Sequence, residues 1–509
     1  MTPDLRNTPV LVVGAGIMGA GIAQVAALAG HPVRLFDLGP GAAQRACDKL
    51  ATLLAGLAAK GKLGADEAQA AIARIVPVAA LQEAADSGLV IEAIVEQLEA
   101  KRSLFQQLEG IVGPDCVLAS NTSSISITAI ANSLQRPERL VGMHFFNPVP
   151  LMKLVEVISG LRSDPELAAA IFELSRAWGK VPVHARSTPG FIVNRVARPY
   201  YAETLALLQE QAATPAVLDA CLKAAGFRMG PCELMDLIGH DTNFAVTNSV
   251  FDANFQDKRY VPSLLQREMV AGGLLGRKSG QGFYSYPTTA AALPVPAWGP
   301  PPLAQELTVH GSGPIADHLE AAAVQSLQGQ GWGPARQPDS GWVGLQIDGA
   351  RLVLTDGRPA SVLTAQAGAF IGITDLAVFD RPLSLPAAPG TALAYSLHPG
   401  ASTSWQSAAP AWLQTLGFAP MLLADAPGLV VARTIAMLIN EAADAVLQGV
   451  CDPAGADTAM KLGLNYPAGP FEWLAGWSVP GVIGVLQALD AEYRGERYRV
   501  SPWLRRQAH

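Results

Sequence analysis

The chain has 509 residues, of which 50% are hydrophobic and 16% charged, which excludes a disordered protein and predicts two to four domains. A net charge of −7 excludes the broadly basic surface that binding to nucleic acid or an anionic membrane requires. The five cysteines are scattered without metal-ligand spacing, no apolar run is long enough to span a bilayer, and no signal peptide opens the chain. We therefore expect a cytoplasmic protein with reduced thiols and no metal.

The first predicted elements are a strand, a glycine-rich turn and a helix. Residues 9–13 form a continuous apolar run, typical of a strand buried on both faces of a parallel sheet. The run ends in Gly14-Ala15-Gly16-Ile17-Met18-Gly19, a helical stretch follows, and a second strand ends at Asp37. This context predicts a dinucleotide-binding turn, and the alternative is a Rossmann turn that binds nothing.

Each part of this turn has its own task. Gly14 allows the tight turn, Gly16 lets a pyrophosphate approach the backbone, and Gly19 allows the helix to pack closely on the strand. The helix N-terminus offers free N–H groups to the phosphates. Asp37 would bind the adenosine ribose hydroxyls and repel a 2′-phosphate, which favours NAD over NADP.

Further strands alternate with helices, and polar residues follow two of them. Apolar runs at 89–93, 117–120 and 140–143 predict a doubly wound α/β domain up to residue 186. Residues 120–124 fall at the carboxyl edge of that sheet, where ligands bind, although one of them could simply cap a helix. Glu96 and Lys101 could line the same cleft, or lie on a solvated helix face.

The predicted catalytic residues follow the last of these strands. His144-Phe145-Phe146-Asn147-Pro148 is a hydrophobic turn, and Glu156 comes twelve residues after the histidine. An imidazole can take the proton of an alcohol, and a carboxylate on its other nitrogen fixes its tautomer. Beside a dinucleotide turn, this pair predicts the oxidation of a secondary alcohol. The alternative is a core histidine at a strand end.

The second half of the chain repeats a helical unit. The predicted parts are a dinucleotide-binding domain at 1–186, a helical domain at 187–286, a Pro/Ala-rich linker at 287–302, a small α/β-like segment without a recognisable site at 303–420, and a second helical domain at 421–509. At a constant offset of 238 residues, Arg195 matches Arg433 and Glu203 matches Glu441. Neither a Gly-x-Gly-x-x-Gly turn nor a second histidine turn precedes the repeat, so we expect one active site per chain.

Six segments resemble the L-3-hydroxyacyl-CoA dehydrogenase family and cover the first 286 residues almost continuously: 12–23, 90–101, 118–128, 142–158, 187–196 and 276–284. The resemblance implies a Rossmann-type domain followed by an all-helical domain like that of 6-phosphogluconate dehydrogenase, here duplicated at the chain end. It also implies NAD-dependent oxidation of (3S)-3-hydroxyacyl-CoA to 3-oxoacyl-CoA. His144 would be the general base with Glu156 behind it. Ser123 and Asn194 would contact the 3-oxygen of the substrate.

The resemblance further implies contacts to the cofactor and to the substrate's CoA part. The implied NAD contacts are Gly14, Gly16, Ile17, Met18, Gly19, Asp37, Val95, Glu96, Lys101, Asn121, Ser123 and Asn147. Lys101 and Lys60 would face the CoA phosphates.

The tail resembles the long bacterial form of this family tied to aromatic-compound catabolism, similar to 3-hydroxyadipyl-CoA and 3-hydroxybutyryl-CoA dehydrogenases of phenylacetate degradation. Segments 226–246 and 428–450 carry this similarity. Short members are expected to dimerise through their helical domains, so the second copy could form an intramolecular pseudo-dimer, with a larger homodimer also open. Candidates to hold a substrate carboxylate are Arg228, Arg259 and Arg497. Two other functions stay open: a dehydrogenase of non-CoA 3-hydroxy acids, and a non-catalytic NAD-binding protein.

Overall fold

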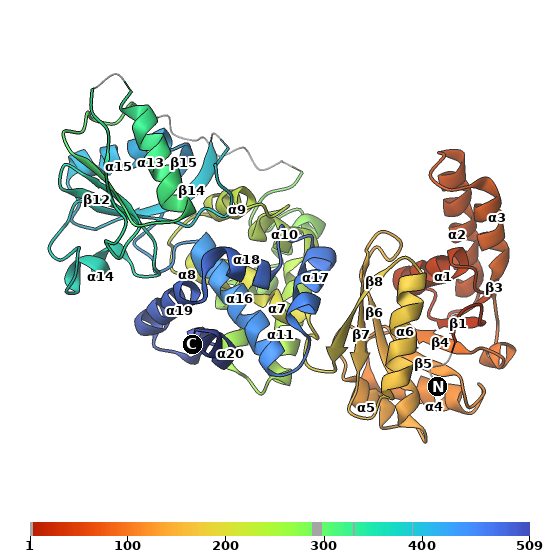
Figure 1. Ribbon diagram of the computed structural model, residues 1–509. Coiled ribbons are helices and arrows are strands. Elements are labelled where there is room, and N and C mark those ends of the chain that lie inside the picture. The colour runs from red at the N-terminus through yellow and green to blue at the C-terminus, as the bar shows by residue number, and fades with distance from the viewer. Residues whose placement is uncertain (1–3, 288–297, 329–330, 389, 509) are drawn as a thin grey trace. The chain divides into compact units, whose positions relative to one another are not determined.

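A computed structural model describes residues 4–287, 298–328, 331–388 and 390–508 (Figure 1). The chain forms two compact units: Met1–Arg195 with Ala445–Asn465, and Val196–Asp444 with Tyr466–His509. We call them unit 1 and unit 2. Most of the linker expected at 287–302 lies outside the described residues, because these stop at 287 and resume at 298.

Unit 1 is built on an eight-stranded sheet in the order β3-β2-β1-β4-β5-β6-β7-β8. The strands are β1 Val10–Val13, β2 Val33–Phe36, β3 Ile75–Pro77, β4 Leu89–Glu92, β5 Val117–Ser120, β6 Leu140–Phe145, β7 Leu154–Ser159 and β8 Val181–Arg186. Neighbouring strands run parallel except β6 and β7, which are antiparallel. The strand order reverses between β1 and β4, and ligands bind at the carboxyl ends of strands at such a point. The predicted Rossmann-type sheet is thus confirmed.

Helices cover this sheet because its central strands are buried on both faces, as β1 and β4 show. The helices of unit 1 are α1 Ile17–Leu28, α2 Ala42–Ala59, α3 Ala65–Arg74, α4 Leu98–Glu109, α5 Ile127–Ala131, α6 Pro165–Ala177, α7 Val193–Val196 and α17 Pro453–Leu464. The last of these comes from the repeated tail and packs against β7 and β8. The domain expected at 421–509 is therefore divided between the two units, which the sequence did not indicate.

Unit 2 contains a second sheet, of seven strands in the order β10-β9-β11-β12-β13-β14-β15. The strands are β9 Leu307–His310, β10 Ala335–Gln337, β11 Gly344–Ile347, β12 Ala350–Leu354, β13 Leu376–Phe379, β14 Thr391–Leu397 and β15 Phe418–Leu422. The helices are α8 Arg198–Gln209, α9 Pro215–Ala224, α10 Pro231–Ile238, α11 His240–Ala253, α12 Leu264–Ala271, α13 Pro314–Ser326, α14 Ala360–Ala365, α15 Thr403–Thr415, α16 Val431–Leu447, α18 Pro470–Trp477, α19 Val479–Tyr493 and α20 Pro502–Gln507.

The second sheet has its own core and matches part of the first. Buried side chains of the strands pack with α13 and α15 around Leu345, Phe379 and Trp412. The offset of 238 residues places β14 and β15 in the positions of β7 and β8, and α17 in the position of α9. Within unit 2, α9 packs on β14, just as α17 packs on β7 within unit 1.

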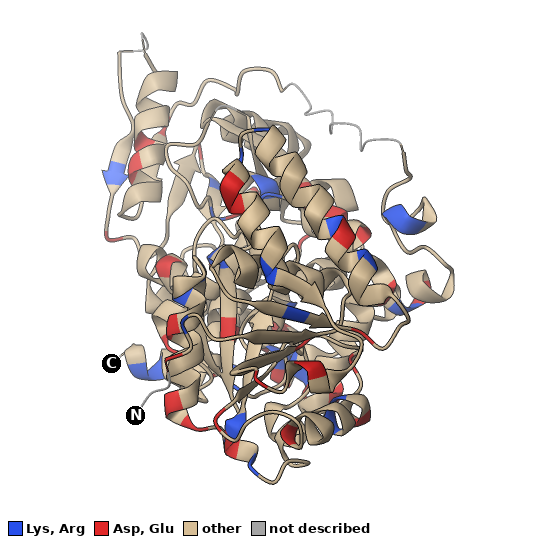
Figure 2. Cartoon of the chain, turned by 90° about the vertical axis from the view of Figure 1, so that its right-hand side faces the viewer, with Lys and Arg blue, Asp and Glu red and all other residues tan. Residues whose placement is uncertain are grey.

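Basic and acidic residues are interspersed along the chain, as the colouring of Figure 2 shows. Among the described residues, no single helix combines the length and the apolar composition needed to cross a bilayer. The pair α18 and α19 meets that test only together, with a bend of 102° between them.

Two buried glutamates hold the helical repeats together in unit 2, each through residues of the other repeat. Glu203 of the first repeat accepts hydrogen bonds from Arg433 Nε at 2.6 Å, Arg497 Nη2 at 2.8 Å and the Tyr498 hydroxyl at 3.0 Å. Burial raises the pKa of Glu203, but Arg497 and Arg433 outweigh it, so the pKa is lowered and the carboxylate is ionised. This side chain and Arg433 are both fully buried.

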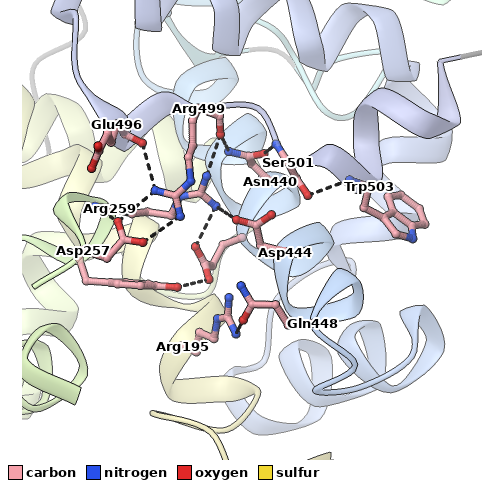
Figure 3. Close-up of polar contacts among 12 residues, drawn as sticks. Arg195, Asp257, Arg259, Asn440, Asp444, Gln448, Glu496, Arg499, Ser501 and Trp503 are labelled. Atoms are coloured by element: carbon pink, nitrogen blue, oxygen red, sulfur yellow. Dashed lines mark hydrogen bonds and ion pairs between the residues drawn. The ribbon is translucent and has the colours of Figure 1, made fainter. Parts of the chain in front are cut away.

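Glu441 of the second repeat has the reciprocal contacts, one of them with Arg259. Figure 3 shows Arg259 and its polar contacts. Glu441 accepts a hydrogen bond from the Tyr260 hydroxyl at 2.6 Å and pairs with Arg259 at 3.4 Å. The two glutamates, like the two Arg-Tyr pairs, are related by the offset of 238 residues. The second repeat adds bonds of its own, since Arg259 also pairs with Asp444.

We predict that Glu203→Ala lowers the free energy of unfolding by about 3–5 kcal/mol, because it leaves a buried guanidinium without its carboxylate. Urea titration followed by circular dichroism measures this change. Glu492→Ala, at an exposed position of α19, is the control and should change it by less than about 0.5 kcal/mol. A loss below about 1 kcal/mol for Glu203→Ala would show that the buried pair contributes little.

Candidate active site

The glycine-rich turn joins β1 to α1 and is shaped to admit a ligand. Gly14 has a φ of +104° and its N–H donates to the carbonyl oxygen of Phe36 at 2.8 Å. A Cβ on Gly19 would lie 1.8 Å from the carbonyl oxygen of Gly14, so no side chain fits there. A Cβ on Gly16 would meet nothing within 4 Å, and no side chain caps α1 at this residue. The first N–H groups of α1 are therefore open to phosphate, and the turn fits a dinucleotide.

Asp37 ties this turn to the end of β2. Its carboxylate accepts hydrogen bonds from the N–H of Ala15 at 2.7 Å and from that of Gly39 at 2.8 Å. Three large apolar side chains in and near the turn are exposed to solvent: Ile17, Leu38 and Val95 are 79%, 89% and 62% exposed. Such exposure suits side chains that cover the rings of a bound nucleotide. Leu38 was missed from sequence, where its only signal is an apolar residue directly after the acid.

We predict that Asp37→Ser raises the KM for NAD⁺ about tenfold or more and weakens discrimination against NADP⁺. A hydrogen bond to a charged group contributes about 1.5–3 kcal/mol, and removing the carboxylate also removes its repulsion of a 2′-phosphate. Initial rates with both cofactors measure this. An unchanged ratio of the two kcat/KM values would contradict the ribose assignment.

Glu96 connects the loop after β4 to the serine-rich loop after β5. Its Oε1 accepts bonds from Thr122 Oγ1 at 2.7 Å and from the N–H groups of Ser123 and Ser124 at 2.9 and 3.0 Å. Burial raises the pKa of Glu96, but Lys101 and these hydrogen bonds outweigh it and lower the pKa to about 2. The carboxylate is thus ionised at neutral pH and fixes the loop that carries Ser123.

Lys101 lies in the interior rather than at the surface. Its side chain is 1% exposed, and its Nζ pairs with Glu92 at 2.6 Å and with Glu96 at 3.2 Å. Glu92 also accepts a bond from Ser120 Oγ at 2.6 Å. The ammonium of Lys101 is therefore paired with carboxylates in the protein interior, and this placement does not support the expected contact with CoA phosphates. Lys101 acts on the site through Glu96, and Glu92 was missed because it reads from sequence as the end of a strand.

The predicted dyad is formed directly across two strands. β6 and β7 pair antiparallel with His144 opposite Glu156, and His144 Nδ1 lies 2.6 Å from Glu156 Oε2. Both side chains are buried, at 6% and 0% exposure. The rings of Phe146 and Phe191 flank the imidazole, with centroids 4.5 and 5.9 Å away. Because Nδ1 faces the carboxylate, it keeps a proton, and Nε2 is the nitrogen that can act as a base.

Two further contacts attach the other predicted residues to this dyad. Asn121 Oδ1 accepts a bond from the N–H of Phe145 at 2.8 Å, which joins the serine-rich loop to the end of β6. Glu156 Oε1 accepts bonds from the N–H groups of Ile192 and Val193 at 2.9 and 3.0 Å, at the start of α7. Asn194 is the next residue of that helix. The structure thus brings Asn121, Ser123, His144, Glu156 and Asn194 to one edge of the sheet.

The remaining predicted residues are less closely connected. Asn147 is exposed just after β6, and Lys60 is exposed at the end of α2. Among the described residues, no hydrogen bond or ion pair joins Lys60 to the dyad or to the glycine turn. Arg259 and Arg497 hold Asp444 and Glu203, so these two guanidinium groups are already engaged by carboxylates of the chain.

The second half has a carboxylate where the first half has its histidine. Asp380 follows β13, and its N–H donates to the carbonyl oxygen of Ala394 on β14 at 2.8 Å. The offset of 238 residues makes Ala394 the counterpart of Glu156. Asp380 therefore faces Ala394 as His144 faces Glu156.

The carboxylate of Asp380 binds the backbone N–H groups at the start of a helix and does not bind an imidazole. It accepts bonds from the N–H groups of residues 430–432 at 2.9, 2.6 and 2.9 Å. Residues 430 and 431 are the counterparts of 192 and 193, whose N–H groups bind Glu156. Burial raises the pKa of Asp380 to about 6 against the effect of these donors. The second half keeps the anchoring carboxylate but has no imidazole at this position.

Three known domain families match this chain. Residues 9–188 match "3-hydroxyacyl-CoA dehydrogenase, NAD binding domain", and residues 190–286 and 428–509 match "3-hydroxyacyl-CoA dehydrogenase, C-terminal domain". Residues 352–427 match "3-hydroxybutyryl-CoA dehydrogenase reduced Rossmann-fold domain". The repeated helical unit and the second sheet therefore both have counterparts in known proteins.

One curated relative and one solved structure match almost the whole chain, and a shorter relative matches about half of it. It is 43% identical over 500 residues to the 3-hydroxyadipyl-CoA dehydrogenase of Escherichia coli K12, a match covering 98% of this chain and 97% of that one. It is 44% identical to a probable 3-hydroxybutyryl-CoA dehydrogenase of Bacillus subtilis, over 54% of this chain and 96% of that one. A crystal structure of 3-hydroxybutyryl-CoA dehydrogenase from Escherichia coli K12 matches with a TM-score of 0.86 at 41% identity, covering 99% of this chain and 98% of that one. The chain therefore belongs to the NAD-dependent 3-hydroxyacyl-CoA dehydrogenase family.

Proposed function

We propose that the chain oxidises (3S)-3-hydroxyacyl-CoA to 3-oxoacyl-CoA with NAD⁺ at the edge of the unit 1 sheet. The observation that carries this proposal is the buried His144–Glu156 pair, with a bond of 2.6 Å, on the same sheet as a dinucleotide turn. When bound, NAD⁺ accepts the hydride from C3 of the substrate. The Gly14–Gly19 turn and Asp37 would hold it.

The residues of the chain move the proton. Nε2 of His144 takes the proton of the 3-hydroxyl group, and the imidazolium that forms is stabilised by Glu156 through Nδ1. Ser123 and Asn194 orient the 3-oxygen by hydrogen bonds, and the phenylalanine rings beside the imidazole exclude water. The proton leaves to solvent after the reaction, so the products are 3-oxoacyl-CoA, NADH and H⁺.

We further propose one catalytic centre per chain. Asp380 stands at the position of the histidine in the second half, and its carboxylate is taken up by three backbone N–H groups. The residue that faces Asp380 is Ala394, so this carboxylate has no imidazole to orient.

The experiment that tests the reaction is a substrate panel followed by NADH absorbance. We expect turnover of (3S)-3-hydroxybutyryl-CoA and (3S)-3-hydroxyadipyl-CoA, and none of the (3R) isomers. Turnover of free 3-hydroxy acids without turnover of thioesters would favour the non-CoA dehydrogenase. NAD⁺ binding without any turnover would favour the non-catalytic protein.

The acyl chain is the finer part of this proposal. The full-length curated relative is named for 3-hydroxyadipyl-CoA, and the full-length solved structure for 3-hydroxybutyryl-CoA. The ratio of the kcat/KM of this chain for 3-hydroxyadipyl-CoA to its kcat/KM for 3-hydroxybutyryl-CoA decides between the two substrates. A ratio above about ten for 3-hydroxyadipyl-CoA would place the enzyme in dicarboxylic acyl-CoA breakdown, as in phenylacetate catabolism. A ratio below one would favour the short unsubstituted chain.

We also propose that the two helical repeats form an intramolecular pseudo-dimer. The reciprocal bonds of Glu203 and Glu441, each to an Arg-Tyr pair of the other repeat, support it, because self-complementary contacts are the mark of a two-fold interface. A cytoplasmic location is supported by the scattered cysteines. Light scattering of the purified chain would show whether whole chains associate further.

A further inference from the structure

The second sheet retains the strand–turn–helix–strand unit of a nucleotide site. β9 and β10 are parallel neighbours joined through α13, as β1 and β2 are joined through α1. The N–H of Gly311 donates to the carbonyl oxygen of Gln337 at 2.9 Å, as the N–H of Gly14 donates to that of Phe36 at 2.8 Å. The turn reads Gly311-Ser312-Gly313-Pro314-Ile315-Ala316, the Gly-x-Gly-x-x-Ala form of the dinucleotide fingerprint.

A cavity of about 690 Å³ opens in front of this turn. It is lined by Ser312 and Gly313 of the turn, by Thr355 after β12 and by Arg381 after β13. β9 is antiparallel to β11, which is antiparallel to β12, and β12 is parallel to β13. The carboxyl ends of β9, β12 and β13 therefore meet at the edge that holds the cavity, the edge where α/β sheets bind ligands. Its volume lies in the range of small-molecule sites.

Two features of the cavity favour an anion. α13 has 13 residues and begins at Pro314 without a side-chain cap on Gly313. Pro314 has no N–H, so the free donors of the first turn are the N–H groups of Ile315 and Ala316, which are open to phosphate. Within the described part of the chain, the guanidinium of Arg381 makes no hydrogen bond and no ion pair; it lies 4.6 Å from the ring centre of Trp477. Burial lowers the pKa of Arg381 to about 10, partly offset by Asp380. A half-buried cation of this kind is stabilised by an anion in the cavity.

Two tryptophans on the lining offer flat apolar surface. Trp342 and Trp477 both line the cavity. The ring of His310 stacks on Trp342 with centroids 4.1 Å apart, which holds the indole in place. Indole rings stack on nucleobases of any kind, and the edge with free N–H groups binds phosphate.

We propose that this cavity is a second, non-catalytic nucleotide site, which binds adenosine diphosphate or a molecule containing it. The phosphates lie at the Ser312–Gly313 turn and the start of α13, beside Arg381, and the base lies against the tryptophans. The choice of adenosine diphosphate rests on the proposed function, because NAD and CoA both carry it. Pro338 follows β10 where Asp37 follows β2, so the ribose meets no carboxylate at that position.

The test uses the full chain, isothermal titration calorimetry and a matched pair of substitutions. Ala15 and Ser312 are the middle residues of the two turns, and Ser312 is exposed, so Ser312→Asp brings a charge to the second turn without disturbing the core. ADP should bind at two sites per chain. Ser312→Asp and Ala15→Asp should each leave one ADP site per chain, and the Kd for ADP at the substituted turn should rise more than thirtyfold. Arg381→Gln should raise the Kd of the second site about tenfold.

Titrations with NADH and with CoA separate the two sources of the moiety. Binding of NADH to Ala15→Asp, lost again in the double variant, assigns the second site to the dinucleotide. CoA also binds at the catalytic edge as part of the substrate, so one CoA site lost in Ser312→Asp and another retained assigns the second site to the acyl-CoA pool. Ser312→Asp should keep the thermal midpoint and the kcat of the unsubstituted chain, which separates this site from the catalytic one. A single ADP site per chain that Ala15→Asp abolishes would overturn the proposal, whether or not the chain oxidises thioesters.

Discussion

His144→Gln is expected to lower kcat by a factor of about 10²–10⁴, the range that general acid–base catalysis contributes. Glutamine fills much of the space of the imidazole and can still donate to Glu156, but it cannot take the proton of the 3-hydroxyl group. The Kd for NADH should stay within about twofold, because the glycine turn and Asp37 are untouched. Stopped-flow NADH absorbance gives kcat, and NADH fluorescence gives the Kd.

The control for this variant is Asp380→Asn, at the counterpart position in the second half. It replaces a carboxylate that accepts three N–H groups with an amide that still has one acceptor oxygen. Its kcat should stay close to that of the unsubstituted chain, whatever happens to the unfolding midpoint. Rates within tenfold of normal for His144→Gln would contradict the assignment of the base.

Glu156→Gln is expected to lower kcat by a similar factor with little loss of stability. One amide oxygen can still accept the N–H groups of Ile192 and Val193, which Glu156 binds at 2.9 and 3.0 Å. The amide nitrogen then faces His144 Nδ1 and favours the tautomer with its proton on Nε2, which cannot act as a base. In a comparable dyad, such a change costs about 10⁴ in kcat.

Glu156→Ala separates the two tasks of this carboxylate. It removes the partner of the imidazole and also leaves two buried N–H groups without an acceptor, each costing about 1–3 kcal/mol. We expect the same loss of kcat as in Glu156→Gln and, in addition, a lower unfolding midpoint in urea. Equal stability of the two variants would show that the helix start finds another acceptor.

The dyad could be predicted from the sequence because its residues fall on neighbouring strands with a short connection. A histidine at the end of one strand and an acid twelve residues later face each other when the two strands pair antiparallel in this register, as β6 and β7 do here. The glycine turn could also be predicted from the sequence, because only glycine fits at positions 14 and 19 and its spacing therefore marks the turn.

The errors came from contacts that the sequence pattern does not report. Lys101 follows the expected cleft in sequence, yet Glu92 draws its ammonium into the interior at 2.6 Å. Asp380 lies in a segment where we saw no chemistry, and only the pairing of β13 with β14 places it opposite the counterpart of Glu156. The offset of 238 residues revealed the repeat but not that α17 belongs with the first sheet. Burial and strand pairing decided each of these positions.

If His144 takes the substrate proton, the pH dependence of kcat/KM must differ between the unsubstituted chain and His144→Gln. For the unsubstituted chain, kcat/KM should fall tenfold per pH unit on the acid side, as one group becomes protonated. In His144→Gln the residual kcat/KM should be independent of pH over the same range. An acid limb of unchanged midpoint in the variant would show that a group other than His144 is the base.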